Sequence, residues 1–379
     1  MSVQSGARKK ALGLFGLAVV VAAAGTGAWW YTTQRGFVTT DDAYVSGNVV
    51  SVTPQVIGDV ASIHAEETRH VTAGSLLVQL DQTDAQLALQ RSQTQLAQTV
   101  RQMAQLQAQL HQLDANIDLR RAELARLQGD QARREVLGLT NAVGKEEVLH
   151  ARSGVDTGKA ALQVAIQERQ TLQARLRDTP LAELPEVRFA AEQVREAWLA
   201  VQRTRIVSPV DGVVARRAVQ VGAHVTPGTP LMAVVSLDHI WVDANFKEIQ
   251  LDNVRINQPV ELTADLYGEK VVYHGKVGGL SAGTGTVFSL LPAQNATGNW
   301  LKVVQRLPVR VELDPAEIAQ HPLRLGLSMQ VRIDVRDTSG QHLVQADATP
   351  IAQTNVLKQD LQAVDQQIAK IIADNSKAG

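Results

Sequence analysis

The most extended pattern in the chain is a pair of apolar rows that repeat every seven residues. The first row is Leu96, Met103, Leu110, Ile117 and Leu124, and the second is Leu106, Leu113 and Leu127. Two rows at this stagger form the a/d seam of a coiled coil. A weaker series follows at Val148, Val155, Leu162, Val187, Val194 and Val201. The pattern predicts two long helices that pack on each other over residues 82–204.

The turn between these helices is predicted near the middle of the segment. The stretch from Gly138 to Gly144 holds the Gly and Asn residues that break a helix there, so residues 138–146 form the tip of an antiparallel hairpin. The run from Asp84 to Leu137 gives an arm of about 80 Å. Pro180 and Pro185 interrupt the returning arm. A hairpin this long is too narrow for an enclosed catalytic pocket and instead extends the reach of the chain.

An internal repeat flanks the hairpin. Gln55–Val78 and Pro209–Met232 are identical at nine of 24 positions, which include Gly58/Gly212 and His70/His224. Each copy has the pattern strand, Gly turn, strand and VTxG turn. Neither copy buries its apolar face alone, so residues 40–81 and 205–237 are predicted to pair into one β-sandwich. The pattern resembles the two halves of a lipoyl or biotinyl domain.

The swinging-arm function of such domains is excluded by the absence of its attachment residue. Covalent carriers need a Lys at a hairpin tip, and no Lys occurs in residues 11–144 or 205–236. The module is therefore predicted to be structural.

A small β-barrel is predicted over residues 238–337. Its strands are Ile240–Phe246, Pro259–Asp265, Lys270–Leu280, Leu301–Leu313 and Leu325–Val335, with a helix at Lys247–Val254.

The polar tail, residues 338–379, has Leu357, Leu361, Val364, Ile368 and Ile371 at the spacing of a short amphipathic helix. The pattern leaves open whether this helix packs on its own chain or on a neighbour. The fold class is an elongated, multidomain α+β protein.

The N-terminal segment has the features of a membrane anchor. Ala11–Tyr31 is uncharged and long enough for one bilayer crossing of about 30 Å. Residues 11–33 are therefore predicted to be a transmembrane helix, with residues 1–10 in the cytoplasm. The interface residues are Arg8, Lys9 and Lys10 on the inner side and Trp29, Trp30 and Tyr31 on the outer side. The alternative is a signal peptide cleaved near Ala22–Ala24. In both cases the rest of the chain lies outside the cytoplasm.

Composition excludes several functions. A net charge of −1 argues against nucleic-acid binding, which needs a basic surface. The absence of Cys excludes disulfides, thiolate catalysis and Cys-based metal centres. His70 and His224 are explained by the repeat rather than by a metal site, because no His or acidic cluster recurs at ligand spacing around both. No catalytic residue, cofactor or metal is expected.

One motif carries the alternative of a periplasmic hydrolase. Gly279–Gly283 matches G-x-S-x-G, with Ser281 as nucleophile and Asp314 and His321 as possible partners. That motif needs a helix after the Ser, and the sequence Thr284-Gly-Thr-Val-Phe that follows is Gly-broken and β-like. A loop between barrel strands is the favoured interpretation.

The order anchor, half-lipoyl, hairpin, half-lipoyl and barrel resembles the HlyD family of membrane fusion proteins, or periplasmic adaptors. The matching stretches are TDDAYVSGN (40–48), RTRIVSPVDG (203–212), PLMAVV (230–235), WVDANFKE (241–248) and LLPAQNATGNWLKVVQRLPVRVEL (290–313). The resemblance covers residues 10–336 and leaves out the tail.

The resemblance implies an adaptor of a tripartite multidrug efflux pump and hence a role in antibiotic resistance. Its partners would be an inner-membrane, proton-driven major-facilitator transporter, a TolC-like outer-membrane channel and further copies of itself in a trimer or hexamer. It would be a single-pass protein of a Gram-negative inner membrane with its bulk in the periplasm. An adaptor for protein secretion beside an ABC exporter is the alternative within transport.

The resemblance also assigns channel docking to the hairpin tip. Drug-pump adaptors carry an Arg-x3-Leu-x6-Ser pattern there. Arg133 and Leu137 match it, whereas Gly144 replaces the Ser and has no side chain to donate a hydrogen bond. Gly144 instead permits a tight turn or a close backbone approach. The predicted docking residues are Arg133, Leu137, Asn141, Val143, Gly144 and Lys145.

Overall fold

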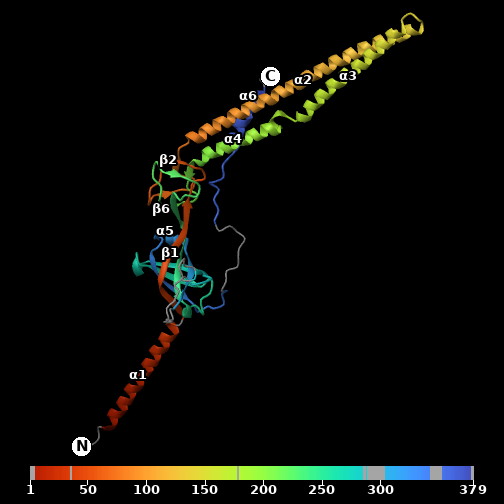
Figure 1. The fold of residues 1–379 in the computed structure, drawn as a ribbon. Coiled ribbons are helices and arrows are strands. Elements are labelled where there is room, and N and C mark those ends of the chain that lie inside the picture. Colours follow the sequence, from red (N-terminus) through yellow and green to blue (C-terminus); the bar gives the residue numbers. More distant parts are fainter. Residues whose placement is uncertain are drawn as a thin grey trace, which may run out of the picture.

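The molecule is a chain of modules arranged end to end. The computed structural model describes residues 5–34, 36–176, 179–284, 287, 304–341 and 352–376. A helix, α1, lies at one end, the β-barrel and the β-sandwich follow, and the hairpin projects from the far end at an angle (Figure 1). The residues of the barrel, the sandwich and the base of the hairpin each gather in a separate apolar core.

The predicted N-terminal helix is present as α1, Ser5–Gln34. The side chains of Arg8, Lys9, Lys10, Trp29, Trp30 and Tyr31 lie outside the described residues. Within the part of the chain that is described, no helix combines the length and the apolar character needed to cross a membrane. The assignment of this segment as an anchor, rather than a cleaved peptide, stays a prediction.

The predicted hairpin is confirmed. Helix α2, Thr83–Leu139, runs outward for about 85 Å, and α3, Lys145–Leu176, returns. A 3-10 turn, η1, Leu181–Glu183, precedes α4, Pro185–Arg203, which leads back to the sandwich. The prolines thus interrupt the return arm where expected, and Pro185 occupies the first turn of α4, where its missing N–H costs no bond.

Burial along the hairpin follows the predicted apolar rows. The fully buried members are Leu96, Met103, Ile117, Val155, Val187 and Val194, and the remaining members are half-buried. Both arms therefore face each other through the seam that the heptad spacing predicts, and the Gln, Ala and Arg positions between the rows are mostly left to solvent.

The two halves of the repeat interlock in one sandwich. The first half supplies β2, Gly58–Ile63, β3, His70–Val71, and β4, Leu76–Leu80; the second supplies β5, Arg205–Val207, β6, Gly212–Arg217, and β7, His224–Val225. Strand β2 pairs with β7, β3 with β6, and β4 with β5. Each half thus supplies strands to the sheets of the other, as the repeat predicts.

Two long strands join the sandwich to the barrel. Strands β1, Phe37–Val52, and β8, Met232–Lys247, have 16 residues each and pair from Val52↔Met232 to Ala43↔Ala244. The predicted border between residues 237 and 238 falls inside β8. The two modules therefore have separate cores on a continuous pair of strands.

Six strands close the barrel. Strands β9, Pro259–Ala264, β10, Val272–Leu280, β11, Arg306–Leu313, and β12, Ser328–Asp334, join β1 and β8 in the order β1-β12-β9-β10-β11-β8, and the β1–β8 pairing closes the ring. Phe246, Leu262 and Tyr273 are fully buried inside. Most of the matching stretch 290–313 before β11 lies outside the described residues.

Local helices in the barrel differ from the prediction. The predicted helix at Lys247–Val254 is wrong: only a 3-10 turn, η2, Glu248–Gln250, forms before Val254 enters the barrel core. A second 3-10 turn, η3, Gly268–Lys270, follows β9. An unpredicted helix, α5, Pro315–Gln320, begins where Asp314 Oδ1 accepts the Ala316 N–H at 2.9 Å. The Asp-Pro pair is a helix start signal that the strand pattern around it obscured.

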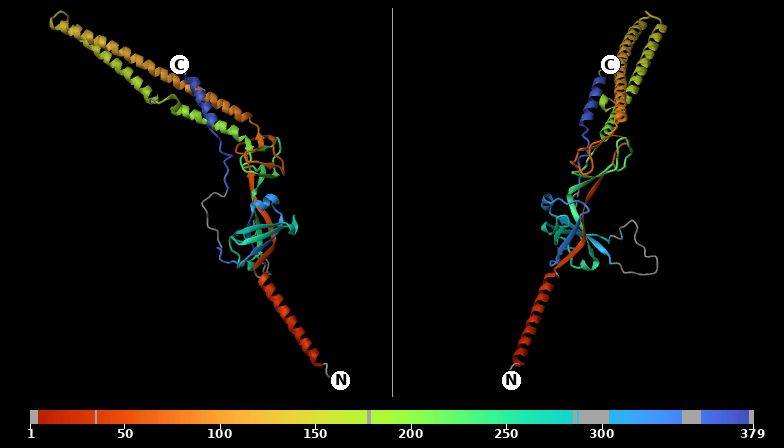
Figure 2. Two further views of the ribbon diagram at one scale, coloured as in Figure 1. Left: turned by 180° about the vertical axis from the view of Figure 1, so that it is seen from behind. Right: turned by 90° about the vertical axis from the view of Figure 1, so that its left-hand side faces the viewer.

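The tail returns to the hairpin. Helix α6, Gln362–Ser376, lies alongside the half of the hairpin nearest the sandwich in both views of Figure 2. In this single chain it packs on α2 and α4.

Candidate functional site: the hairpin tip

The tip is a five-residue turn closed by backbone hydrogen bonds. The Asn141 N–H donates to Gly138 O at 3.2 Å, and the Ala142 N–H donates to Leu137 O at 3.0 Å. Asn141 has φ +54°, a left-handed conformation that Asn tolerates better than most residues. These bonds satisfy carbonyls that the end of α2 would otherwise leave free.

The close approach of the two arms lies at Gly138 rather than Gly144. A Cβ added to Gly138 would lie 3.2 Å from Val148 Cγ2, whereas one added to Gly144 would meet nothing within 4 Å. Gly144 is therefore open to solvent, and a Ser at this position would have room for its side chain.

The structure divides the predicted docking residues into two groups. Arg133 and Leu137 lie on one strip of α2 beside Val136, and Arg133 forms an ion pair with Asp130. Asn141, Val143 and Lys145 border a shallow hollow at the turn together with Leu139 and Leu149. The Arg–Leu pair and the turn residues thus belong to neighbouring parts of the tip.

Exposed apolar side chains gather around the tip. The exposed fractions are 63% for Val136, 45% for Leu137, 87% for Leu139 and 62% for Leu149. We call these four residues the tip patch. Exposed apolar side chains concentrated in one region are typical of a site of protein contact. Of the four, only Leu137 was predicted as a docking residue. The sequence does contain a signal for the other three: Val136 and Leu139 are apolar but lie off both seven-residue rows, as Leu149 does on α3, so the seam does not account for them.

An ion pair fixes the arms just below the tip. Arg152 Nε of α3 donates to Glu135 Oε1 of α2 at 3.0 Å, and Gln131 Nε2 donates to the same oxygen at 2.9 Å. The hydrogen bond from Gln131, followed by that from Arg152, lowers the pKa of Glu135 below its usual range. The carboxylate is thus paired with Arg152 of the opposite arm one step below the tip patch, in an exposed contact that contributes little to stability by itself.

Ser281, Asp314 and His321, the residues of the hydrolase alternative, contact other residues rather than one another. Ser281 Oγ donates to Gly283 O at 3.0 Å, Asp314 caps α5, and the ring of His321 lies 5.6 Å from the ring of Tyr267. Strand β10 ends at Leu280, and residues 281–284 are not helical. The described residues therefore do not form a nucleophile elbow.

The equivalent histidines of the repeat have different surroundings. His224 Nδ1 and Asp59 Oδ1 share a hydrogen bond of 2.7 Å across the β2–β7 pair, and His70 is exposed. Among the described residues, no group of three His, Cys, Asp or Glu side chains is placed to hold a metal ion.

A lipoyl-like module split by a helical hairpin and followed by a small barrel defines a membrane fusion protein. The family model described as "EMRA, alpha-helical hairpin domain" matches residues 83–204. The chain is 48% identical to the Multidrug export protein EmrA of Escherichia coli K12 over 92% of its own length and 90% of that protein. The EmrA of Haemophilus influenzae is 44% identical over 97% of this chain and 95% of that protein. The chain belongs to the EmrA family of HlyD-type membrane fusion proteins.

A solved structure of a periplasmic adaptor protein EmrA is also similar, with a lower sequence identity. It is 18% identical, covers 79% of this chain and 99% of its own, and aligns with a TM-score of 0.41.

Proposed function

We propose that this chain is the periplasmic adaptor of a tripartite multidrug efflux pump, joining an inner-membrane, proton-driven major-facilitator transporter to a TolC-like outer-membrane channel. The observation that carries the proposal is the hairpin: an arm of about 85 Å that ends in an exposed apolar patch. Family members named for multidrug export support the choice of cargo.

The adaptor would be held at the inner membrane by α1. Apart from Thr26, its described side chains are apolar, and they are exposed; Leu12, Phe15 and Val20 are examples. An unpartnered helix of this kind is suited to lipid contact. Arg8, Lys9 and Lys10 would then face the cytoplasm, and Trp29, Trp30 and Tyr31 the outer interface. The barrel, sandwich and hairpin would extend outward from that anchor.

The proposed role is mechanical rather than catalytic. The chain bridges and seals, and the transporter supplies the energy. A single hairpin encloses no conduit, so several copies must surround the exported molecule, and a trimer or hexamer around the channel axis would provide that closure.

Affinity capture tests the choice of transporter. Full-length chain is cross-linked in native membranes, isolated and its partners are identified by mass spectrometry. The proposal expects a proton-driven transporter of the major-facilitator class. Capture of an ABC exporter in its place would favour the protein-secretion adaptor.

A further inference from the structure

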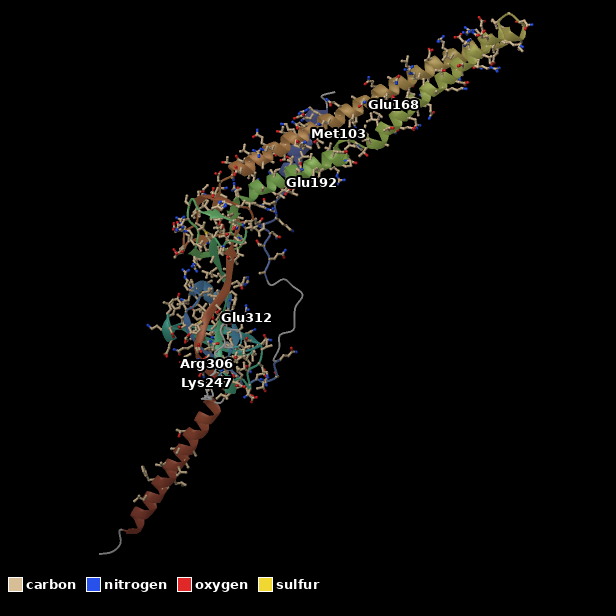
Figure 3. The ribbon with its side chains drawn as sticks, viewed as in Figure 1. Met103, Glu168, Glu192, Lys247, Arg306 and Glu312 are labelled. Atoms are coloured by element: carbon tan, nitrogen blue, oxygen red, sulfur yellow. The ribbon has the colours of Figure 1, made fainter. Side chains whose placement is uncertain are left out.

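The C-terminal segment occupies a helix-binding groove on the hairpin. Val364 and Ile368 of α6 are 0% and 5% exposed, and they share one apolar core with residues of α2 and α4. Figure 3 labels Met103 on α2 and Glu192 on α4 in the half of the hairpin along which α6 lies. The base of the hairpin is therefore a three-helix bundle, whereas the outer half has two helices.

Polar contacts fix the position of α6 in this groove. Arg195 of α4 donates from Nε to Asp365 Oδ1 at 2.7 Å and from Nη1 to Glu192 Oε1 at 2.6 Å. Arg101 of α2 donates from Nη1 to Asn375 Oδ1 at 2.5 Å. One contact lies near each end of α6, so the helix has a defined register along the hairpin.

The residues just before α6 contact the sandwich. Thr354 Oγ1 donates to Pro209 O at 2.7 Å, and a Cβ added to Gly74 would lie 3.8 Å from Val356 Cγ1. Leu357 lines a small cavity of about 160 Å³ together with the end of β1 and with β5. A single segment thus contacts both the sandwich and the hairpin.

From these contacts we propose that residues 352–376 form a brace that acts within one chain and holds the hairpin at a fixed angle to the sandwich. Covalently, the hairpin meets the sandwich only through two short links, at Asp81–Gln82 and at Thr204. Two such links act as a hinge unless a third contact spans them. The brace is that third contact, and it covers the apolar groove between α2 and α4 that would otherwise face solvent.

The first experiment identifies the occupant of the groove. The chain has no Cys, so Arg195→Cys and Asp365→Cys introduce unique thiols. The double variant, treated with a short bis-maleimide, is expected to give an internally cross-linked monomer. A mixture of the two single variants is expected to give no dimer. A dimer from the mixture would assign the helix to a second copy, and no cross-link in either sample would show that the groove is empty; both results overturn the proposal.

The second experiment tests the mechanical role. Val364→Asp places a charge in the core of the bundle, whereas Gln366→Asp places it on the exposed side of α6. Spin labels at exposed Val221 of the sandwich and His111 of α2, in chains diluted with unlabelled protein, report the hinge. Val364→Asp is expected to broaden the distance distribution, and Gln366→Asp to leave it narrow.

Hydrogen exchange supplies a second readout, because a disordered variant would also broaden the distances. Val364→Asp should raise exchange in α4 and in α2 around Met103 by roughly tenfold, while barrel amides keep their protection. The milder Asp365→Asn, which loses only the charge facing Arg195, should move both readouts in the same direction. Unchanged distances and exchange in both variants would overturn the brace. This inference does not rest on the proposed transport function and survives the failure of that function.

Discussion

Asp114 on α2 accepts a hydrogen bond from Arg169 Nε on α3 at 2.7 Å, across 55 residues of sequence. With the Glu135–Arg152 pair near the tip, this contact shows the two arms in one antiparallel register. The apolar rows between the two pairs face each other, so the projection of the tip depends on that seam.

Leu110→Asp is expected to disable export. The half-buried Leu110 packs against the core at the base of the hairpin, and a carboxylate there costs about 2 kcal/mol or more. Leu119→Asp is the matched control, because Leu119 lies on the same helix but is 64% exposed. Drug susceptibility of cells that depend on each variant, with membrane abundance checked by immunoblot, measures the effect. Full resistance with Leu110→Asp would contradict the seam as the element that export requires.

The equivalent glycines of the repeat are expected to respond differently to Ala. A Cβ at Gly212 would lie 2.3 Å from Val235 O, whereas one at Gly58 would meet Leu80 at an ordinary 3.6 Å. Gly212→Ala should therefore destabilise the sandwich by about 3 kcal/mol, and Gly58→Ala should change its stability by less than about 1 kcal/mol. Thermal or denaturant unfolding of both variants tests this. Equal effects at the two sites would mean that the β6–β8 spacing is looser than described.

The α5 contact with the barrel is expected to weaken as pH rises. The imidazole Nδ1 of His274 lies 2.7 Å from Glu317 Oε1, and the backbone N–H of His274 donates to Glu317 Oε2 at 2.6 Å. The hydrogen bond with Glu317 raises the pKa of His274 above its ordinary 6.5, and the charges of Glu261 and Asp314 add to that effect. The charged pair thus stabilises the folded state fully below 6.5, and this contribution disappears as pH rises through the raised pKa.

His274→Asn separates this effect from other titrations. In the parent chain, the protection of α5 should fall as pH rises above the ordinary His pKa of 6.5, and in His274→Asn that fall should be absent. Hydrogen exchange of residues 315–320, corrected for intrinsic rates, measures it. Because the imidazole is well exposed, the change should be modest. An identical pH profile in the parent chain and the variant would show that the pair makes no contribution.

The tip patch is expected to be needed for assembly but not for folding. Leu139→Ser and Leu149→Ser remove 87% and 62% exposed side chains, so the unfolding temperature should change little. Binding to a purified outer-membrane channel, measured by biolayer interferometry, should weaken by about tenfold for the double variant, which corresponds to 1.4 kcal/mol. Val164→Ser is the control, because Val164 lies in the middle of α3, away from the tip, and its side chain is 58% exposed. Equal binding by all variants would remove the patch from the interface.

Periodicity predicted the hairpin because heptad rows encode which faces of two helices meet. The same rule says nothing about Val136 or Leu139, which lie off both rows. Their side chains are exposed and do not pack in the seam, so the seven-residue spacing carries no information about them. The continuity of β8 was missed because it depends on pairing with β1, which is far away in sequence. The pairs Val49↔Val235 and Gly47↔Ile240 lie on either side of a bulge, and the strand continues between them. The amphipathic pattern of α6 showed that one face is buried but not which surface buries it, because the groove combines residues of α2 and α4 that are far apart in sequence.

Site-specific cross-linking from the turn tests the central claim most directly. A photoreactive residue at Ala142 in the tip is compared with one at Val221 of the sandwich, which is exposed but distant from the tip. In cells with an intact envelope, the Ala142 probe should capture an outer-membrane channel, and the Val221 probe should not. Capture of the inner-membrane transporter alone from Ala142 would mean that the hairpin points the opposite way and would contradict the proposed bridge.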